Sequence, residues 1–168
     1  MSAIFVPAKL QDLKEIWKII QHAIARRKAD GSNQWQDGYP NPEILTLDIS
    51  KHQGFVLREE QAIIGYAAVI INDEPQYDNI DGAWLTRSDF VVYHRVAIAT
   101  EFLGQGYAKL LIQGIHNYAE KNNIHSVKAD TNFDNPAMMK IFEKLSYQYC
   151  GEVKINGSPR RAYEKLLD

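Results

Sequence analysis

The stretch VVYHRVAIATEFLGQGYAKLLI, residues 91–112, changes from one hydrophobic period to another. From Val92 to Ile98 it alternates over a β-branched run, and this period of two predicts a strand. Gly104-Gln105-Gly106 then interrupts the pattern. From Tyr107 to Tyr118 apolar residues recur every three or four positions, as on one face of a helix. Because a strand, a glycine turn and a helix start present backbone NH groups to an anion, the stretch predicts a phosphate site.

The composition is that of one ordinary globular domain. We expect residues 1–168 to form a single domain, since 168 residues are enough for one core and few for two. Nineteen basic and 21 acidic residues give a net charge of -2 without a run of like charges, which argues against nucleic-acid and membrane-surface partners. No segment approaches the roughly 18 apolar residues of a membrane span, and the first residues lack a leader pattern. A cytoplasmic protein is therefore expected.

The cysteine and histidine content predicts no metal site. Cys150 is the only cysteine, so no internal disulfide and no cysteine-based zinc site can form. It lies in a strand-like run, where packing is a more ordinary role than nucleophile. The five histidines show no HxH or HExxH spacing.

Hydrophobic patterns predict the remaining elements. Helices are expected at residues 9–27, 44–49 and 135–145, and strands at 4–6, 54–58, 62–71, 125–131, 147–153 and 161–167. The polar segment 72–89 is expected to cover one face of the sheet. The loop at residues 29–42 carries Trp35 and Tyr39, which either anchor the loop over the core or form one wall of a ligand pocket.

This order of elements, with HRVAI (94–98), GQGYAKLL (104–111) and DTNFDNPAMMKIFEKLSY (130–147), resembles the GNAT family of acetyl-CoA-dependent N-acetyltransferases. The resemblance covers nearly the whole chain. It implies an α/β (α+β) fold in which a mixed, mostly antiparallel and centrally splayed sheet is flanked by helices. It also implies acetyl-CoA as acyl donor, without a metal.

The family writes its cofactor loop as Gln/Arg-x-x-Gly-x-Gly/Ala, and Gly104 and Gly106 fill the glycine positions. Glu101 stands where Gln or Arg is usual, so we expect its side chain to face solvent while backbone amides hold the pyrophosphate. Asn135 resembles the family's asparagine on the cofactor arm, although helix capping is an equally good role for it. Along the pantetheine arm and the loop, the resemblance implies cofactor contacts from Val96, Ala97, Ile98, Leu103, Gly104, Gln105, Gly106, Tyr107 and Ala108.

One departure concerns the leaving group. The family commonly has a tyrosine that protonates the departing thiolate, and this chain has Phe142 at that position. Candidate replacements as proton donor are Tyr107, Tyr147 and Tyr149. Of these we take Tyr147 as a candidate catalytic residue. Phenylalanine has no proton to give, so the substitution also raises the alternative of a non-catalytic, acyl-CoA-binding sensor or regulatory module.

The attacking amine must be neutral, so a base near the thioester is useful. His94 and Asp130 are the candidates, against the simpler roles of a core histidine and a strand-end acid. The expected reaction is direct attack by a primary amine, of a small molecule or a peptide, in a ternary complex. Trp35, Tyr39 and Trp84 are candidate walls of the acceptor site, and Arg160 or Arg161 could bind a substrate carboxylate. The acceptor, the acyl length and the oligomeric state stay open, and C-terminal strands could pair in a homodimer.

Overall fold

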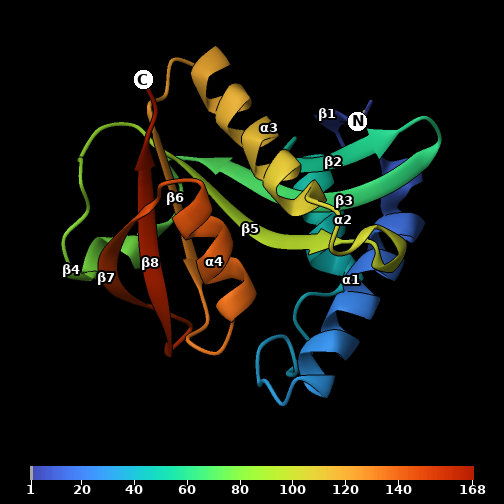
Figure 1. Ribbon diagram of the computed structural model, residues 1–168, viewed down its shortest axis with the longest axis horizontal. Coiled ribbons are helices and arrows are strands. Elements are labelled where there is room, and N and C mark those ends of the chain that lie inside the picture. The colour runs from blue at the N-terminus through green and yellow to red at the C-terminus, as the bar shows by residue number, and fades with distance from the viewer. Residues whose placement is uncertain (1) are drawn as a thin grey trace. The chain divides into compact units, whose positions relative to one another are not determined.

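The computed structural model describes residues 2–168 (Figure 1). These residues form four α-helices, eight strands and three short 3-10 turns. In chain order they are β1 (Ile4–Pro7), η1 (Leu10–Asp12), α1 (Leu13–Ala29), α2 (Pro42–Ser50), β2 (Gly54–Glu59), β3 (Ala62–Ile71), η2 (Pro75–Asn79), β4 (Asp81–Gly82), β5 (Val91–Ile98), η3 (Thr100–Phe102), α3 (Tyr107–Lys121), β6 (Ser126–Thr131), α4 (Pro136–Lys144), β7 (Gln148–Ile155) and β8 (Ser158–Leu166).

The strands form a hydrogen-bonded sheet in the order β1-β2-β3-β5-β6-β8-β7-β4. The pairs β1–β2, β2–β3, β6–β8, β7–β8 and β4–β7 are antiparallel, and β5–β6 is parallel. The register of the parallel pair joins Val91 to Val127 and Val92 to Lys128, which lie at the start of both strands. This is the expected α/β architecture with a mixed, mostly antiparallel sheet.

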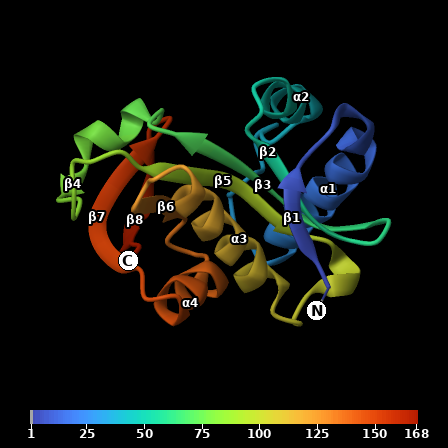
Figure 2. The ribbon, with the colours of Figure 1, turned by 90° about the horizontal axis from the view of Figure 1, so that it is seen from above.

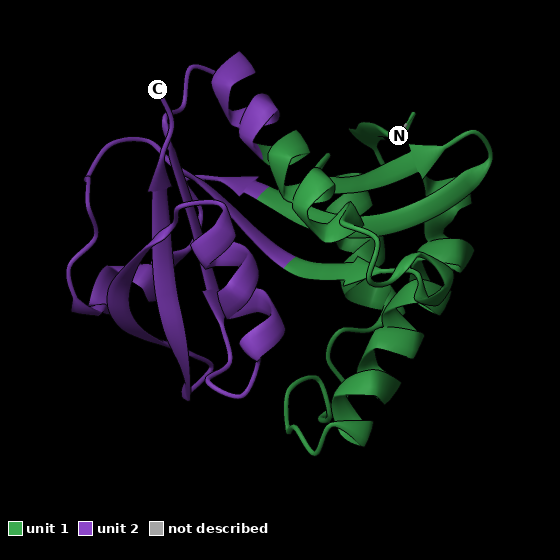
Figure 3. Cartoon of the chain, viewed as in Figure 1, with its two compact units in different colours: residues 1–69, 95–115 green, residues 70–94, 116–168 purple. Residues whose placement is uncertain are grey.

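The chain divides into two compact units (Figure 3). Unit 1 comprises residues 1–69 and 95–115, and unit 2 comprises residues 70–94 and 116–168. Three elements, β3, β5 and α3, run from one unit into the other.

In unit 1, helices cover both faces of the strands (Figure 2). The core on one face joins α1 and α2 to the strands through Ile16, Ile19, Ile20, Ala23, Leu45, Val56, Tyr66 and Ala97. On the other face α3 approaches β1 closely, because a Cβ at Gly114 would lie 2.6 Å from Cγ of Phe5. The absence of a side chain at Gly114 therefore permits this contact.

In unit 2, α4 and the segment before β5 pack on opposite faces of β8. The ring of Phe142 of α4 packs at a tilt against that of Tyr163 at a centroid distance of 4.5 Å, whereas Tyr77 of η2 packs in a cluster with the neighbouring Ala162. The expectation that residues 72–89 cover a face of the sheet is therefore confirmed. The segment also adds β4, which was not expected and pairs with Gly151 and Glu152 of β7.

Candidate functional site

The glycine loop lies between the 3-10 turn η3 and α3, in unit 1. Gly104 and Gly106 have φ of +72° and +85°, a region that glycine adopts without steric cost. A Cβ at Gly104 would meet no atom within 4 Å, so the backbone is open on that side. Residues 103–106 are exposed, as is Glu101, which confirms its expected orientation toward solvent.

The start of α3 provides hydrogen-bond donors beside this loop. The amide of Leu110 donates to the carbonyl of Gly106 at 3.2 Å, and the preceding helical amides have no intrahelical acceptor. Backbone amides of the loop and of Tyr107, Ala108 and Lys109 can therefore bind an anion, which the positive end of the helix dipole favours.

Tyr107, the first residue of α3, points into unit 1. Its ring meets Phe102 edge-on at 5.5 Å, and its hydroxyl contacts the Glu59 carboxylate at 3.4 Å. Burial and this carboxylate raise the pKa of Tyr107. The tyrosine thus helps to fix the loop to β2.

The strand before the loop contains a backbone irregularity. Arg95 has φ of +56°, although it lies within β5 between the candidate residues His94 and Val96. Beyond it, Ala97 packs in the core with α1 and α2. Ile98 and Leu111 of α3 both lie where a Cβ at Gly65, in the neighbouring strand, would be added, with Ile98 Cδ1 at 2.7 Å and Leu111 Cδ2 at 3.7 Å from that position. The candidate pantetheine segment 96–98 therefore follows a left-handed residue.

The Arg95 side chain is clamped within unit 1. Its Nε and one terminal nitrogen donate to the two oxygens of Asp48 at 2.9 and 2.6 Å, and its other terminal nitrogen donates to the Tyr39 hydroxyl at 2.6 Å. Tyr66 donates to Asp48 at 2.6 Å, and burial together with Asp48 raises the pKa of Tyr66. Burial alone would lower the pKa of Arg95, but Tyr39 and Asp48 raise it.

The two aromatic residues of loop 29–42 have different surroundings. Trp35 is half-buried and packs against the core formed by α1 and α2, as an anchor of the loop would. Tyr39 is held at its hydroxyl by Arg95 while the residue remains 39% exposed, as a pocket wall requires.

In unit 2, the structure brings His94 and Asp130 into one network. Nε2 of His94 lies 2.8 Å from Oε2 of Glu74, and Nδ1 lies 3.8 Å from Oδ2 of Asp130. The same Asp130 oxygen accepts a 2.5 Å hydrogen bond from the Tyr77 hydroxyl, and Arg160 Nε lies 3.8 Å from the other oxygen. Glu74 and Tyr77 are site residues that the sequence patterns did not reveal.

The network assigns the proton on the imidazole. Burial alone would raise the pKa of Glu74. Its hydrogen bonds, led by that with His94, together outweigh this effect, so the pKa is lowered and the group is a carboxylate at neutral pH. A carboxylate only accepts hydrogen bonds, and Nε2 must therefore carry a proton. In neutral His94 the lone pair is on Nδ1, the nitrogen that faces Asp130.

Trp84 packs against this network and against a buried lysine. Its ring lies 5.0 Å from that of Tyr77, and its Nε1 donates to the Tyr77 carbonyl at 2.9 Å. Lys128 places Nζ 4.5 Å from the Trp84 ring and 4.2 Å from that of Phe90. Burial lowers the pKa of Lys128. Trp84 thus shares unit 2 with His94, with its indole NH already bonded.

Tyr147 lies in a buried hydrogen-bonded chain of unit 2. Tyr93 donates to the Tyr147 hydroxyl at 3.2 Å, and this hydroxyl lies 2.7 Å from Nε2 of His116. Burial raises the pKa of Tyr147 well above its usual value. Phe142 is fully buried and packs on the Tyr147 ring at 5.2 Å.

Asn135 caps α4. Its side-chain oxygen accepts the amide hydrogen of Met138 at 3.2 Å, which confirms the capping role. The side-chain amide nitrogen remains a possible donor to a ligand.

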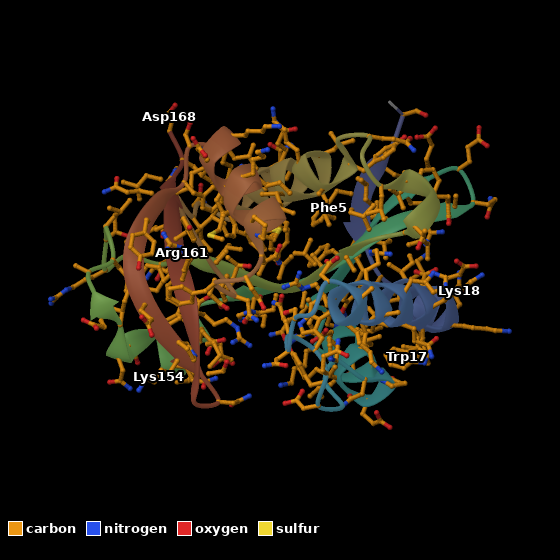
Figure 4. All side chains as sticks on the ribbon, turned by 60° about the horizontal axis from the view of Figure 1, so that its bottom comes forward. Phe5, Trp17, Lys18, Lys154, Arg161 and Asp168 are labelled. Carbon is orange, nitrogen blue, oxygen red and sulfur yellow. The ribbon has the colours of Figure 1, made fainter. Side chains whose placement is uncertain are left out.

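The two arginines of β8 differ in their surroundings. Arg160 contacts Asp130, as described, and Ser158. Arg161 (Figure 4) stacks over Tyr149 at 4.2 Å and donates to the Tyr163 hydroxyl at 3.0 Å. A substrate carboxylate would therefore compete with internal partners at both residues.

Residues 2–168 contain no cluster suited to a metal ion: no group of three or more His, Cys, Asp and Glu residues is arranged to hold one. Within the same residues, no helix is long and apolar enough to cross a membrane. Cys150 is buried, and burial raises the pKa of its thiol.

Comparison with known proteins gives consistent matches. A model of the Acetyltransferase (GNAT) family matches residues 15–147. The uncharacterized N-acetyltransferase YesJ of Bacillus subtilis is 25% identical over 152 residues, which are 86% of this chain and 81% of that protein. A GNAT acetyltransferase of Streptococcus agalactiae is 35% identical and superposes with a TM-score of 0.91 over 99% of this chain and 96% of the other.

More distant structures share the fold. The protein yncA of Salmonella typhimurium, solved with its cofactor acetyl-CoA, is 16% identical with a TM-score of 0.72 over 100% of this chain and 95% of the other. The extent of the family match and the Streptococcus agalactiae relative establish the relationship. The chain belongs to the GNAT family of acetyltransferases.

Proposed function

We propose that this chain transfers the acetyl group of acetyl-CoA to a primary amine by direct attack in a ternary complex. The observation that carries the proposal is the open glycine loop at the start of α3, with φ of +72° and +85° at Gly104 and Gly106. Two structures of the same fold, yncA and a phosphinothricin acetyltransferase of Sinorhizobium meliloti, were solved with acetyl-CoA. Their likeness supports the choice of donor.

The residues of the loop fit a pyrophosphate. Amides of residues 103–108 would hold the phosphate oxygens, and the open space at Gly104 admits them without a Cβ in the way. Backbone groups of Val96, Ala97 and Ile98 would bind the pantetheine arm, and the side-chain amide of Asn135 would donate to it. Acetyl-CoA supplies a thioester, whose carbonyl carbon receives the amine while the C–S bond breaks.

The charges around His94 suit an ammonium group. Glu74 and Asp130 both lie beside the imidazole, and Arg160 balances one of the two carboxylates. In the proposed reaction Nδ1 of His94 takes a proton from the acceptor ammonium group. Glu74 and Asp130 then stabilise the imidazolium that forms. A backbone amide of residues 96–98 donates to the developing oxyanion.

Tyr147 is the candidate donor of the proton to the thiolate. Its hydroxyl receives a hydrogen bond from Tyr93, which would stabilise the phenolate left after the proton transfer until solvent returns the proton. The second candidate function, acyl-CoA binding without turnover, is favoured by the fully buried Phe142 and by the contact between the Tyr147 hydroxyl and His116.

Thiol release from acetyl-CoA, measured over a panel of small amines, polyamines, amino acids and peptides, tests the proposal. We expect turnover with at least one amine, and we expect His94→Gln to lower kcat roughly 100-fold because the base is lost. His125→Gln, at an exposed histidine of the same unit, is the control. Tyr147→Phe should lower kcat if the tyrosine is the acid. Binding of acetyl-CoA without turnover on any amine would instead establish the sensor function.

A second pair of variants tests the loop. Gly106→Trp should raise KM for acetyl-CoA, because the indole would occupy the space of the phosphates. Gly31→Trp is matched to it, since Gly31 lies outside the loop, has φ of +80° and has open space where a Cβ would be added, with no atom within 4 Å. Equal KM values for the two variants would refute the phosphate site.

A further inference from the structure

We infer that Arg95 is a positioning residue for the acetyl transfer: clamped on Asp48, it holds the left-handed turn of β5 and the Tyr39 ring in place. The inference rests on the proposed function and adds two residues, Arg95 and Asp48, to its machinery. Every contact of this clamp lies within unit 1.

The backbone of β5 is irregular at Arg95. A non-glycine residue with positive φ is strained and persists where the surroundings hold it. Arg95 has φ of +56° in the middle of a strand. The sequence alternation predicts Tyr93 and Ala97 on one face, yet Tyr93 lies with Tyr147 and His116 of α3, while Ala97 packs with α1 and α2. The alternation therefore changes phase at Arg95, as at a β-bulge.

The side chain of this irregular residue is firmly anchored. Arg95 and Asp48 make a bidentate pair whose side chains are 8% and 4% exposed. Such a fork fixes the plane of the guanidinium as well as its position. Tyr66 donates a further hydrogen bond to the same carboxylate. The Arg95 side chain is thus held by Asp48 of α2, whose carboxylate is in turn held by Tyr66 of β3.

The same guanidinium also reaches the exposed loop before α2. The remaining terminal nitrogen of Arg95 donates to the Tyr39 hydroxyl, and the guanidinium carbon lies 5.8 Å from the Tyr39 ring centroid. One cation therefore holds both a candidate acceptor wall and the residue that precedes Val96. Loss of the cation should disturb the reacting geometry without removing any group that binds the pyrophosphate.

The variant Arg95→Gly separates the effect of losing the side chain from the effect of changing the backbone conformation. Glycine adopts positive φ without strain, so the variant removes the clamp without forcing the backbone out of its conformation. We expect kcat with the best amine to fall about tenfold or more, because small misplacements of reacting groups are costly. The Kd for coenzyme A, measured by calorimetry, should rise by a smaller factor than kcat falls, since the loop amides that hold the pyrophosphate are untouched and only the contacts of residues 96–98 with the pantetheine arm are disturbed.

Asp48→Asn and Arg95→Lys complete the test. Both should lower kcat, because neither retains a charged bidentate pair. The double variant Arg95→Gly/Asp48→Asn should be no worse than the worse single variant, as expected for two halves of one contact. Independent effects of the two substitutions would overturn the inference.

The matched control is a second ion pair of unit 1. Asp12 accepts from Arg58 at 2.8 Å and, with 7% side-chain exposure, is buried like Asp48. Asp12→Asn should lose comparable stability with unchanged kcat below its melting temperature. An equal fall of kcat in the control, or wild-type kcat in Arg95→Gly, would reduce Arg95 to a stabilising residue.

If the wild-type chain acetylates no amine, the proposed function fails, and kcat cannot test the role of Arg95. Hydrogen exchange then tests the clamp by itself. Amides of residues 94–98 should exchange about tenfold faster in Arg95→Gly than in Asp12→Asn, because the irregular backbone has lost its clamp. Equal exchange in the two variants would overturn the inference.

Discussion

At the scale of single residues, burial decides the charge of His116. Enclosure in unit 2 and, to a lesser extent, repulsion by Lys165 lower its pKa from 6.5 to about 4. The imidazole is therefore neutral at pH 7, and its unprotonated Nε2 can accept the hydrogen bond of the Tyr147 hydroxyl. Protonation would remove this acceptor and place a positive charge in a buried setting.

The sign of the resulting pH dependence follows from linkage. The folded chain binds the His116 proton less tightly than the unfolded chain does. The contribution of His116 to the free energy of unfolding is therefore fully present above pH 6.5 and is lost as the pH falls toward 4. The loss is roughly 3 kcal/mol at most, from about 1.4 kcal/mol per pKa unit. His116→Gln should weaken the acid sensitivity, because glutamine can accept the bond without titrating. Urea unfolding at pH 7 and pH 5 measures the difference, and an equal loss of stability in both chains would contradict the prediction.

The candidate site was predictable only where its residues lie near a recognisable pattern. His94 and Asp130 were expected from the strands that flank the glycine loop, and they share one network. Their partners come from elsewhere: Glu74 is 20 residues before His94, and Tyr77 is 53 residues before Asp130. No hydrophobic period relates residues so far apart, since their proximity depends on how the sheet folds.

At the scale of elements, the start of α4 combines a structural and a proposed binding role. The oxygen of Asn135 caps the helix, and its amide nitrogen is the group proposed for the cofactor arm. The two roles use different atoms of one side chain. Substitutions that keep one atom and remove the other can therefore separate them.

Asn135→Ser keeps a capping oxygen and removes the amide donor. We expect stability close to that of the wild-type chain but a KM for acetyl-CoA raised roughly fivefold, as for the loss of one neutral hydrogen bond. Asn135→Ala should share the change in KM and also lose about 1 kcal/mol of stability. Denaturant unfolding and initial rates supply the two measurements. If both variants had the wild-type KM for acetyl-CoA, Asn135 would cap α4 but would not bind the cofactor.

Elements with strong local patterns were predicted and those defined by distant contacts were not. The β7–β8 hairpin follows from Asn156-Gly157, whose φ values of +51° and +81° suit a two-residue turn. By contrast β4 is two residues long and depends on close backbone approach: a Cβ at Gly82 would lie 2.2 Å from the carbonyl oxygen of Cys150. Only the folded sheet provides that partner. Equally, the left-handed Arg95 is invisible in an alternating sequence, because the carboxylate that holds its side chain, Asp48, lies on α2, far away in the chain.

At the scale of the whole molecule, the two compact units share β3, β5 and α3. A cut between the units would pass through two strands and a helix. Each unit would then lose part of a hydrogen-bonded ladder and part of a helix that packs on it. The chain is therefore expected to unfold as one cooperative domain.

The three tryptophans allow this expectation to be tested unit by unit. Trp17 and Trp35 lie in unit 1, and Trp84 lies in unit 2. Trp84→Phe leaves fluorescence that reports unit 1, whereas the double variant Trp17→Phe/Trp35→Phe leaves fluorescence that reports unit 2. In each variant the urea midpoint from fluorescence should equal the midpoint from far-ultraviolet circular dichroism, which serves as an internal control for any stability change. A separation of more than about 0.5 M between the two probes would show that the units unfold independently, contrary to a single domain.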